Sequence, residues 1–138
     1  MSNDVIEKLS YSKEKDNYLS PVESFKLCFS YYNKQDYEKA FEFCKNSAEQ
    51  GYSPAQYNLG LMYAQGIGIK QDYAEAVKWY IKAAKQGHAQ SQYNLGLMYS
   101  FGVVGVKQDL AEARKWYSKA AAQGHKEAQA ALERLGKR

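Results

Sequence analysis

Two histidines and two cysteines are the residues of this 138-residue chain whose types most often ligate metals or act as nucleophiles. His88 and His125 each follow a Gln-Gly pair, so they hold the same position in two consecutive segments. Stacked helices place such positions about 10 Å apart, which is too far for two ligands of one metal ion. The sequence therefore predicts no metal site.

Cys28 and Cys44 form no Cys-x-x-Cys pair, and two cysteines cannot build a disulfide framework. Both are expected on the two helices of the first helical hairpin. The main interpretation is two reduced, buried thiols. A disulfide across the hairpin is the alternative, because the two helices could bring the residues close together.

No other pattern in the chain indicates catalysis. The segment Gly66-Ile67-Gly68 lies between two predicted helices with no strand before it, so it indicates a turn and not a phosphate-binding loop. No Ser-His-Asp or Cys-His set with a structural rationale emerges, because helix caps and exposed helix faces account for the acidic residues. We expect no enzymatic activity, no cofactor and no small-molecule substrate.

These residues must be positioned by a short unit that the chain repeats. The segment Leu-Gly-Leu-Met-Tyr occurs at 59–63 and again at 95–99, and Lys-Trp-Tyr occurs at 78–80 and 115–117. The copies are thus separated by 36 and 37 residues. Two amphipathic helices of about twelve residues and their connections account for a repeat of this length. The later units differ by one residue, which lies in the predicted loop at 101–105.

The residues at the ends of the predicted helices support this division of the chain into repeated helical hairpins. Ser20-Pro21-Val22-Glu23 has the residues of a capping box. The predicted second helices begin after an aspartate and end at a glycine that permits a left-handed backbone; these residues are Asp36, Asp72, Asp109, Gly51, Gly87 and Gly124. Gly60 and Gly96 are expected to let the first helix approach Ala76 and Ala113 of the second.

The predicted fold is an all-α solenoid of three helix-turn-helix hairpins and a C-terminal capping helix. Polar residues dominate positions 1–19, so a flexible N-terminal tail is expected there. Residues 20–138 form the solenoid, with units at about 20–51, 52–87 and 88–124 and the cap at 125–136. The first unit is degenerate, and its interhelix loop is shorter.

The segment from Ala55 to Gly87 resembles a Sel-one-like repeat, a relative of the tetratricopeptide repeat. The resemblance is close across residues 53–124, weaker over 20–51 and partial over 125–135. It implies a right-handed superhelix that acts as an adaptor between proteins and has no catalytic residues. Some cysteine-rich members carry a disulfide in every repeat, but the two later units of this chain contain no cysteine.

The resemblance also suggests a binding surface, because the first helices of tetratricopeptide units line the concave face. The matching residues are the predicted partner-binding set, namely Phe25, Lys26, Phe29, Tyr32, Tyr57, Asn58, Leu61, Tyr93, Asn94 and Leu97. The alternative is that the aromatic and aliphatic members only pack within the stack. Asn58 and Asn94 could hold the backbone of an extended peptide, or each could steady its own turn. Lys26 suggests an acidic partner.

Composition and charge bear on the class of partner and on the location of the protein. A formal charge of +4 with singly spaced lysines does not favour nucleic acid as a partner. There is no apolar run of about 20 residues and no signal-peptide pattern, so we expect a cytoplasmic protein that does not enter a membrane. We interpret the chain as a non-enzymatic module that binds another protein or a peptide. The alternative is a small immunity or antitoxin-like protein that occludes one cognate toxin.

Overall fold

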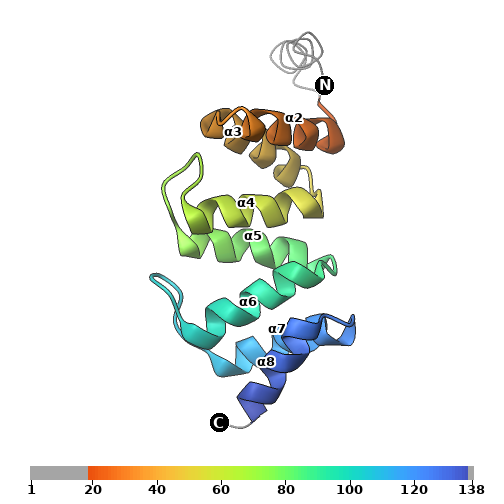
Figure 1. The fold of residues 1–138 in the computed structure, drawn as a ribbon, viewed down its shortest axis with the longest axis vertical. Helices are drawn as coiled ribbons and strands as arrows, with labels where there is room; N and C mark the ends of the chain where they lie inside the picture. The colour runs from red at the N-terminus through yellow and green to blue at the C-terminus, as the bar shows by residue number, and fades with distance from the viewer. Residues whose placement is uncertain (1–18, 137–138) are drawn as a thin grey trace.

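The computed structural model describes residues 19–136, on which it places seven α-helices and no strand. Figure 1 shows the helices following one another along an elongated stack, with the first and last of them at opposite ends. The helices are α2 (Pro21–Asn33), α3 (Tyr37–Glu49), α4 (Ser53–Gln65), α5 (Tyr73–Lys85), α6 (Ala89–Phe101), α7 (Leu110–Ala122) and α8 (Lys126–Gly136).

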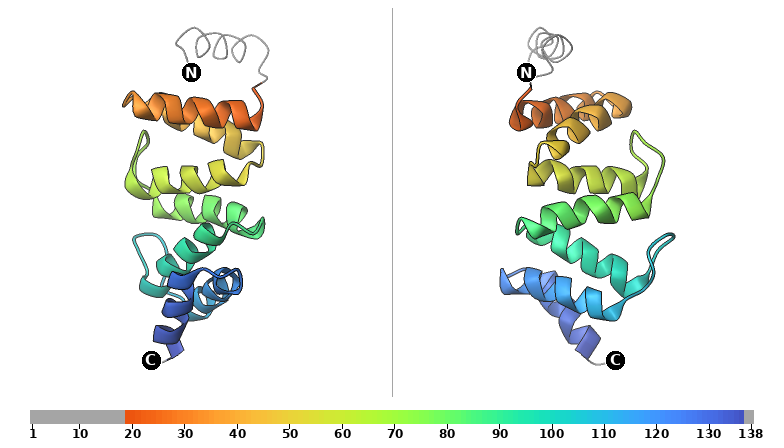
Figure 2. Two further views of the ribbon diagram at one scale, coloured as in Figure 1. Left: turned by 45° about the vertical axis from the view of Figure 1, so that its right-hand side comes forward. Right: turned by 180° about the vertical axis from the view of Figure 1, so that it is seen from behind.

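The helices pack as three hairpins, α2 with α3, α4 with α5 and α6 with α7, and α8 covers α7. Each hairpin also packs on the next, through α3 against α4 and α5 against α6, so the expected all-α solenoid is confirmed. The longer loops after α4 and α6 lie along the same edge of the stack (Figures 1 and 2). Residues 1–18 of the predicted tail lie outside the described residues, whereas Leu19 is only 5% exposed.

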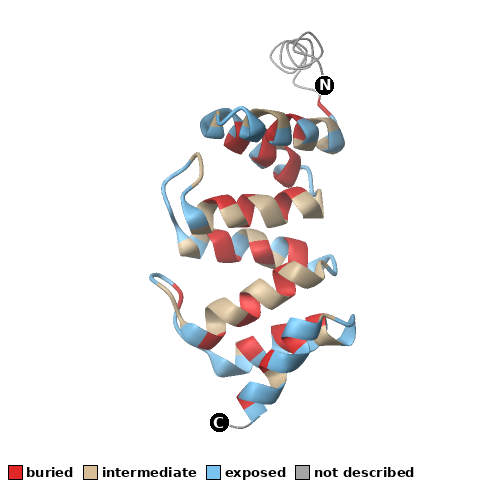
Figure 3. Ribbon diagram, viewed as in Figure 1, coloured by how far each residue is buried: buried red, intermediate tan, exposed pale blue. Residues whose placement is uncertain are grey.

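The buried residues lie on the sides of the helices that pack against neighbouring helices (Figure 3). The buried side chains of residues 19–136 fall into three clusters that succeed one another along the stack. The first includes Leu27, Phe43 and Leu59 from α2, α3 and α4, so it joins the first hairpin to the second. This arrangement is expected of a solenoid, in which each unit covers the apolar face of its neighbour.

The predicted caps are confirmed. The Ser20 hydroxyl accepts a hydrogen bond from the Glu23 backbone N–H at 3.1 Å, and the Glu23 carboxylate accepts one from the Ser20 N–H at 3.2 Å. Asp36, Asp72 and Asp109 each accept a hydrogen bond from the N–H three residues later, at 3.3, 3.1 and 3.1 Å. These bonds satisfy donors that the first turn of a helix leaves unpaired.

The glycines after the second helices also have the expected conformation. Gly51, Gly87 and Gly124 have φ angles of +91°, +94° and +89°. A Cβ at any of them would meet no atom within 4 Å, so the backbone angle and not space demands glycine there.

Gly60 and Gly96 permit close helix packing, but with partners that differ from the expected ones. A Cβ on Gly60 would lie 2.6 Å from Cε1 of Tyr80, and the atoms nearest to it belong to that ring and not to Ala76. Gly96 meets the ring of Tyr117 in the same way. The first helix therefore lacks a side chain at this position because a buried tyrosine of the second helix fills the space.

Buried glutamines join consecutive units. Gln92 is 4% exposed, and its Nε2 donates to the Ala84 carbonyl at 3.0 Å while its Oε1 accepts from Gln123 at 3.0 Å. Gln56 makes the same two bonds one unit earlier, with the Ala48 carbonyl at 3.2 Å and with Gln86 at 2.8 Å. Because a buried amide is costly unless it is paired, these bonds fix the register between hairpins.

Candidate partner-binding surface

The predicted aromatic residues Phe25, Tyr57 and Tyr93 pack between units. Each of them contacts the aromatic or imidazole ring that stands just before the first helix of the following unit. The ring centroids are 5.3 Å apart for Phe25 and Tyr52, 4.8 Å for Tyr57 and His88, and 4.7 Å for Tyr93 and His125. All three are only half-buried, so they border the surface. Their main contacts are nevertheless within the stack.

His88 and His125 therefore have a structural role that their spacing in the sequence did not predict. The Nδ1 atom of His88 accepts a hydrogen bond from the Ser91 N–H at 3.2 Å, and Nδ1 of His125 accepts one from the Ala128 N–H at 3.2 Å. Each histidine thus caps a helix and packs against a tyrosine of the preceding unit. No group of three or more possible metal ligands occurs among residues 19–136.

Asn94, one of the two predicted amides, is engaged inside the protein. Its Oδ1 accepts a hydrogen bond from Gln90 Nε2 at 3.0 Å. Burial raises the pKa of the Tyr57 and Tyr80 hydroxyls, and a hydrogen bond from each to Asn94 opposes that rise. Asn94 therefore steadies its own turn and the contact with the preceding unit, which was the alternative interpretation of this residue.

Asn58, which holds the same position on α4, has no hydrogen-bond partner among residues 19–136. The residue one turn earlier is Pro54, whose side chain carries no donor. The residues that match Tyr57 and Tyr80 in the first unit are Phe25 and Cys44, which carry no hydroxyl. The Asn58 amide is therefore available to a partner.

Asn58 lies in a groove between α2 and α4, near the C-terminal ends of both helices. The groove has a volume of about 270 Å³, and it brings together four of the predicted partner-binding residues, Phe29, Tyr32, Asn58 and Leu61. Phe29 and Tyr32 are 48% and 43% exposed. The remaining lining residues are Cys28, Met62, Gln65 and Ile67. We call this site the α2–α4 groove.

The first unit, which supplies α2 to the groove, lacks the glycine–tyrosine pair of the other two. Cys28 stands at the position of Gly60, and Cys44 stands at that of Tyr80. Between α4 and α6, the Tyr80 side chain extends to Asn94, whereas the short Cys44 side chain cannot reach Asn58 in the same way. Both thiols are buried and free, which confirms the main interpretation of the cysteines. The hydrogen bond with Cys28 and burial raise the pKa of the Cys44 thiol.

The row of first helices is almost uncharged. Helices α4 and α6 contain no charged residue, and α2 contains only Glu23 and Lys26. Glu23 is held in the capping box, whereas Lys26 is exposed and has no ion pair among residues 19–136. Leu97 is half-buried against the third core cluster. Lys26 does not line the groove but precedes its residue Phe29 by three positions on α2, whereas Tyr93, Asn94 and Leu97 lie outside the groove.

A family model for the Sel1 repeat matches residues 25–52, 53–88 and 89–125. The chain belongs to the Sel1 repeat family. Proteins of this family are typically protein-interaction modules without catalytic activity. Among curated proteins, none matches this Sel1 repeat chain.

Solved structures agree with this assignment. One is c5321, a protective antigen of uropathogenic Escherichia coli with an SLR fold, at 33% identity and a TM-score of 0.79 over 92% of this chain and 28% of that one. Another is a Sel1 repeat protein from Oxalobacter formigenes, at 34% identity and 0.77 over 90% of this chain and 52% of that one. The Sel1 repeat chain thus spans about a quarter and about half of these two proteins.

A third solved structure shares the fold alone. Helicobacter pylori cysteine-rich protein B is 24% identical, with a TM-score of 0.67 over 93% of this chain and 97% of that one. No helix on residues 19–136 of this Sel1 repeat protein is both long and apolar enough to cross a membrane.

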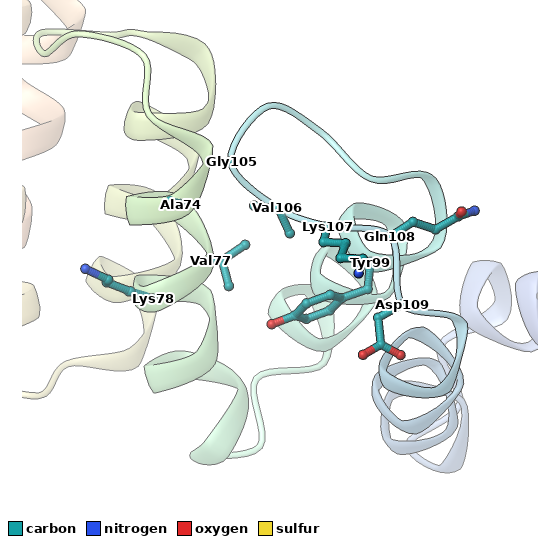
Figure 4. A pocket seen from close by; sticks show the side chains of 9 residues that line it. All are labelled: Ala74, Val77, Lys78, Tyr99, Gly105, Val106, Lys107, Gln108 and Asp109. Carbon is teal, nitrogen blue, oxygen red and sulfur yellow. The ribbon is translucent and has the colours of Figure 1, made fainter.

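A second, wider cavity of this Sel1 repeat protein lies between α5 and the loop before α7, with a volume of about 600 Å³. Figure 4 shows Tyr99 and Val106 directed from α6 and this loop toward Val77 on α5. Two of its polar side chains are already engaged, because Lys78 contacts Glu75 at 3.3 Å and Asp109 caps α7. It is therefore a weaker candidate than the α2–α4 groove.

Proposed function

We propose that this Sel1 repeat protein binds an extended segment of another protein along α2, α4 and α6, with the α2–α4 groove as the principal contact. The observation that carries the proposal is the unpaired amide of Asn58 beside exposed Phe29 and Tyr32. An asparagine amide both donates and accepts, so it can pair with the N–H and C=O of one peptide unit. The surrounding apolar wall can hold a side chain of the same segment.

The size of the groove supports a peptide over a small molecule. Its volume of about 270 Å³ lies just below the roughly 300–1,000 Å³ of pockets that enclose a whole small ligand. We therefore propose a non-enzymatic role. The alternative of an immunity protein uses the same row of helices against a folded toxin, and no observation on residues 19–136 favours it.

The test is a selection of displayed random peptides on the full chain, followed by binding to variants. The double variant Cys28→Gly/Cys44→Tyr copies the glycine–tyrosine pair of the later units, so we expect it to fold and to fill the groove. Selected peptides should bind this variant at least about tenfold more weakly. The control is Lys78→Ala at the second cavity, which should bind as the wild type does.

The selection can also contradict the proposal. If the selected peptides bind Cys28→Gly/Cys44→Tyr as tightly as the wild type, the groove is not the principal contact. If Lys78→Ala alone loses the peptides, the second cavity is the site instead. Helicity measured by circular dichroism confirms that each variant is folded.

A further inference from the structure

We infer that the segment held in the α2–α4 groove carries a large uncharged apolar side chain, with an acidic residue two positions away that pairs with Lys26. The inference rests on the proposed function and specifies the chemistry of the partner. It follows from the wall of the groove, the lack of charge along the first helices and the position of Lys26.

The wall of the groove selects the anchor side chain. Phe29 and Tyr32 expose nearly half of their surface there, and Leu61 and Met62 lie opposite them on α4. Aromatic rings and a methionine thioether contact aliphatic and aromatic side chains favourably. A charged anchor would lose its water without gaining a partner, because none of the lining residues is charged. The anchor is therefore apolar.

The charge pattern excludes charged side chains over most of the row. Helices α4 and α6 offer no ionic partner, so charged residues of a bound segment would be desolvated beside them without compensation. Lys26 is the exception, since it is exposed and unpaired among residues 19–136. A carboxylate placed beside it would gain an ion pair that no other position on these three helices offers.

The spacing follows from helix and strand geometry. Lys26 precedes Phe29 by three residues on α2, so the two positions lie about 5–6 Å apart on one face of the helix. Where an extended segment lies in the groove and runs parallel to α2, its side chains on the same side recur every second residue, at about 6.6 Å. An anchor beside Phe29 therefore places the residue two positions away beside Lys26.

The experiment is an NMR titration of the full-length chain with short serine-glycine peptides. Each peptide carries a central Leu or Phe, with Glu, Gln or Lys two positions before or after it. We expect the Asn58 side-chain amide signals to shift with the Glu peptides, and affinity to fall about tenfold from Glu to Lys as attraction becomes repulsion. Lys26→Glu should invert this order, so that the Lys peptide binds best.

The outcomes separate the inference from the proposed function. If peptides bind in the groove and Cys28→Gly/Cys44→Tyr abolishes that binding, but Glu and Lys peptides bind equally, the proposed function stands and the inference is wrong. If no peptide shifts Asn58 at all, both fail. Leu9 is an apolar residue of the predicted N-terminal tail. If Asn58 instead responds to Leu9→Asp or to dilution of the protein, the chain itself or a second copy occupies the groove, which also overturns the inference.

Discussion

Gln90 donates a hydrogen bond to Asn94 across one turn of α6, at 3.0 Å between Nε2 and Oδ1. On α4 the same two positions hold Pro54 and Asn58, and the proline leaves the amide without a donor. Two asparagines in the same repeat motif therefore differ in role. Asn94 belongs to the internal packing, whereas Asn58 faces the α2–α4 groove.

Substitution of Pro54 by Gln should give Asn58 the partner that Asn94 has. We expect peptides selected on the wild type to bind Pro54→Gln more weakly, by about threefold to tenfold, since a hydrogen bond must be broken before binding. Pro54→Ala is the matched control, because it removes the ring without adding a donor. Fluorescence anisotropy measures both affinities, and equal weakening in the two variants would assign the effect to the proline and not to Asn58.

Gly60→Ala should destabilise the protein, because the new Cβ would lie 2.6 Å from the buried Tyr80 ring. Overpacking of this kind costs about 1–3 kcal/mol. Gly136→Ala is the control, since a Cβ there would meet no atom within 4 Å. Urea unfolding monitored by circular dichroism measures the difference. An unchanged midpoint for Gly60→Ala would show that the ring moves freely and does not set the helix separation.

Gln92→Leu should lower the free energy of unfolding by about 1–3 kcal/mol, because the Ala84 carbonyl and the Gln123 amide lose their buried partner. Gln129 holds the same position on α8, but it is exposed and makes one bond, to the Ala121 carbonyl at 3.2 Å. Gln129→Leu should therefore cost less than about 0.5 kcal/mol. Similar losses in the two variants would argue against the role of burial.

The sequence was sufficient to predict the hairpins, since their signals are local. Capping by Ser20 or Asp72 depends on residues three positions apart, and the glycine after each second helix depends on its own φ angle. The glutamine bonds were not predicted, because Gln86 and Gln56 lie thirty residues apart and meet only once the units stack. The recurrence of glutamine in each unit was the available signal.

The residues of the α2–α4 groove, the proposed binding site, were predicted only in part for the same reason. Identical motifs surround Asn58 and Asn94, so the motif alone assigns them one role. What separates them is the preceding unit: the Tyr80 hydroxyl hydrogen-bonds to Asn94, whereas the matching residue before Asn58 is Cys44, which carries no hydroxyl. The degenerate first unit thus holds the groove, and the regular units use the same positions for packing.

His88 makes stability depend on pH. Burial lowers its pKa in the folded chain below the ordinary value of 6.5, and its Nδ1 must keep a lone pair to accept the Ser91 N–H. Well above pH 6.5 both folded and unfolded chains hold the neutral ring, so the full stability is present. As the pH falls from 6.5 toward the lower folded pKa, the unfolded chain takes up a proton first, and stability is lost.

His88→Asn should reduce that loss, because asparagine also caps helices but does not titrate in this range. We expect the difference in unfolding free energy between wild type and variant to shift in favour of the variant as the pH falls from 7.5 to 5.5. Urea unfolding at several pH values measures this difference, from which the contributions of the carboxylates cancel. Parallel profiles for the two proteins would show that protonation of His88 does not oppose folding, and the cap would then tolerate an imidazolium.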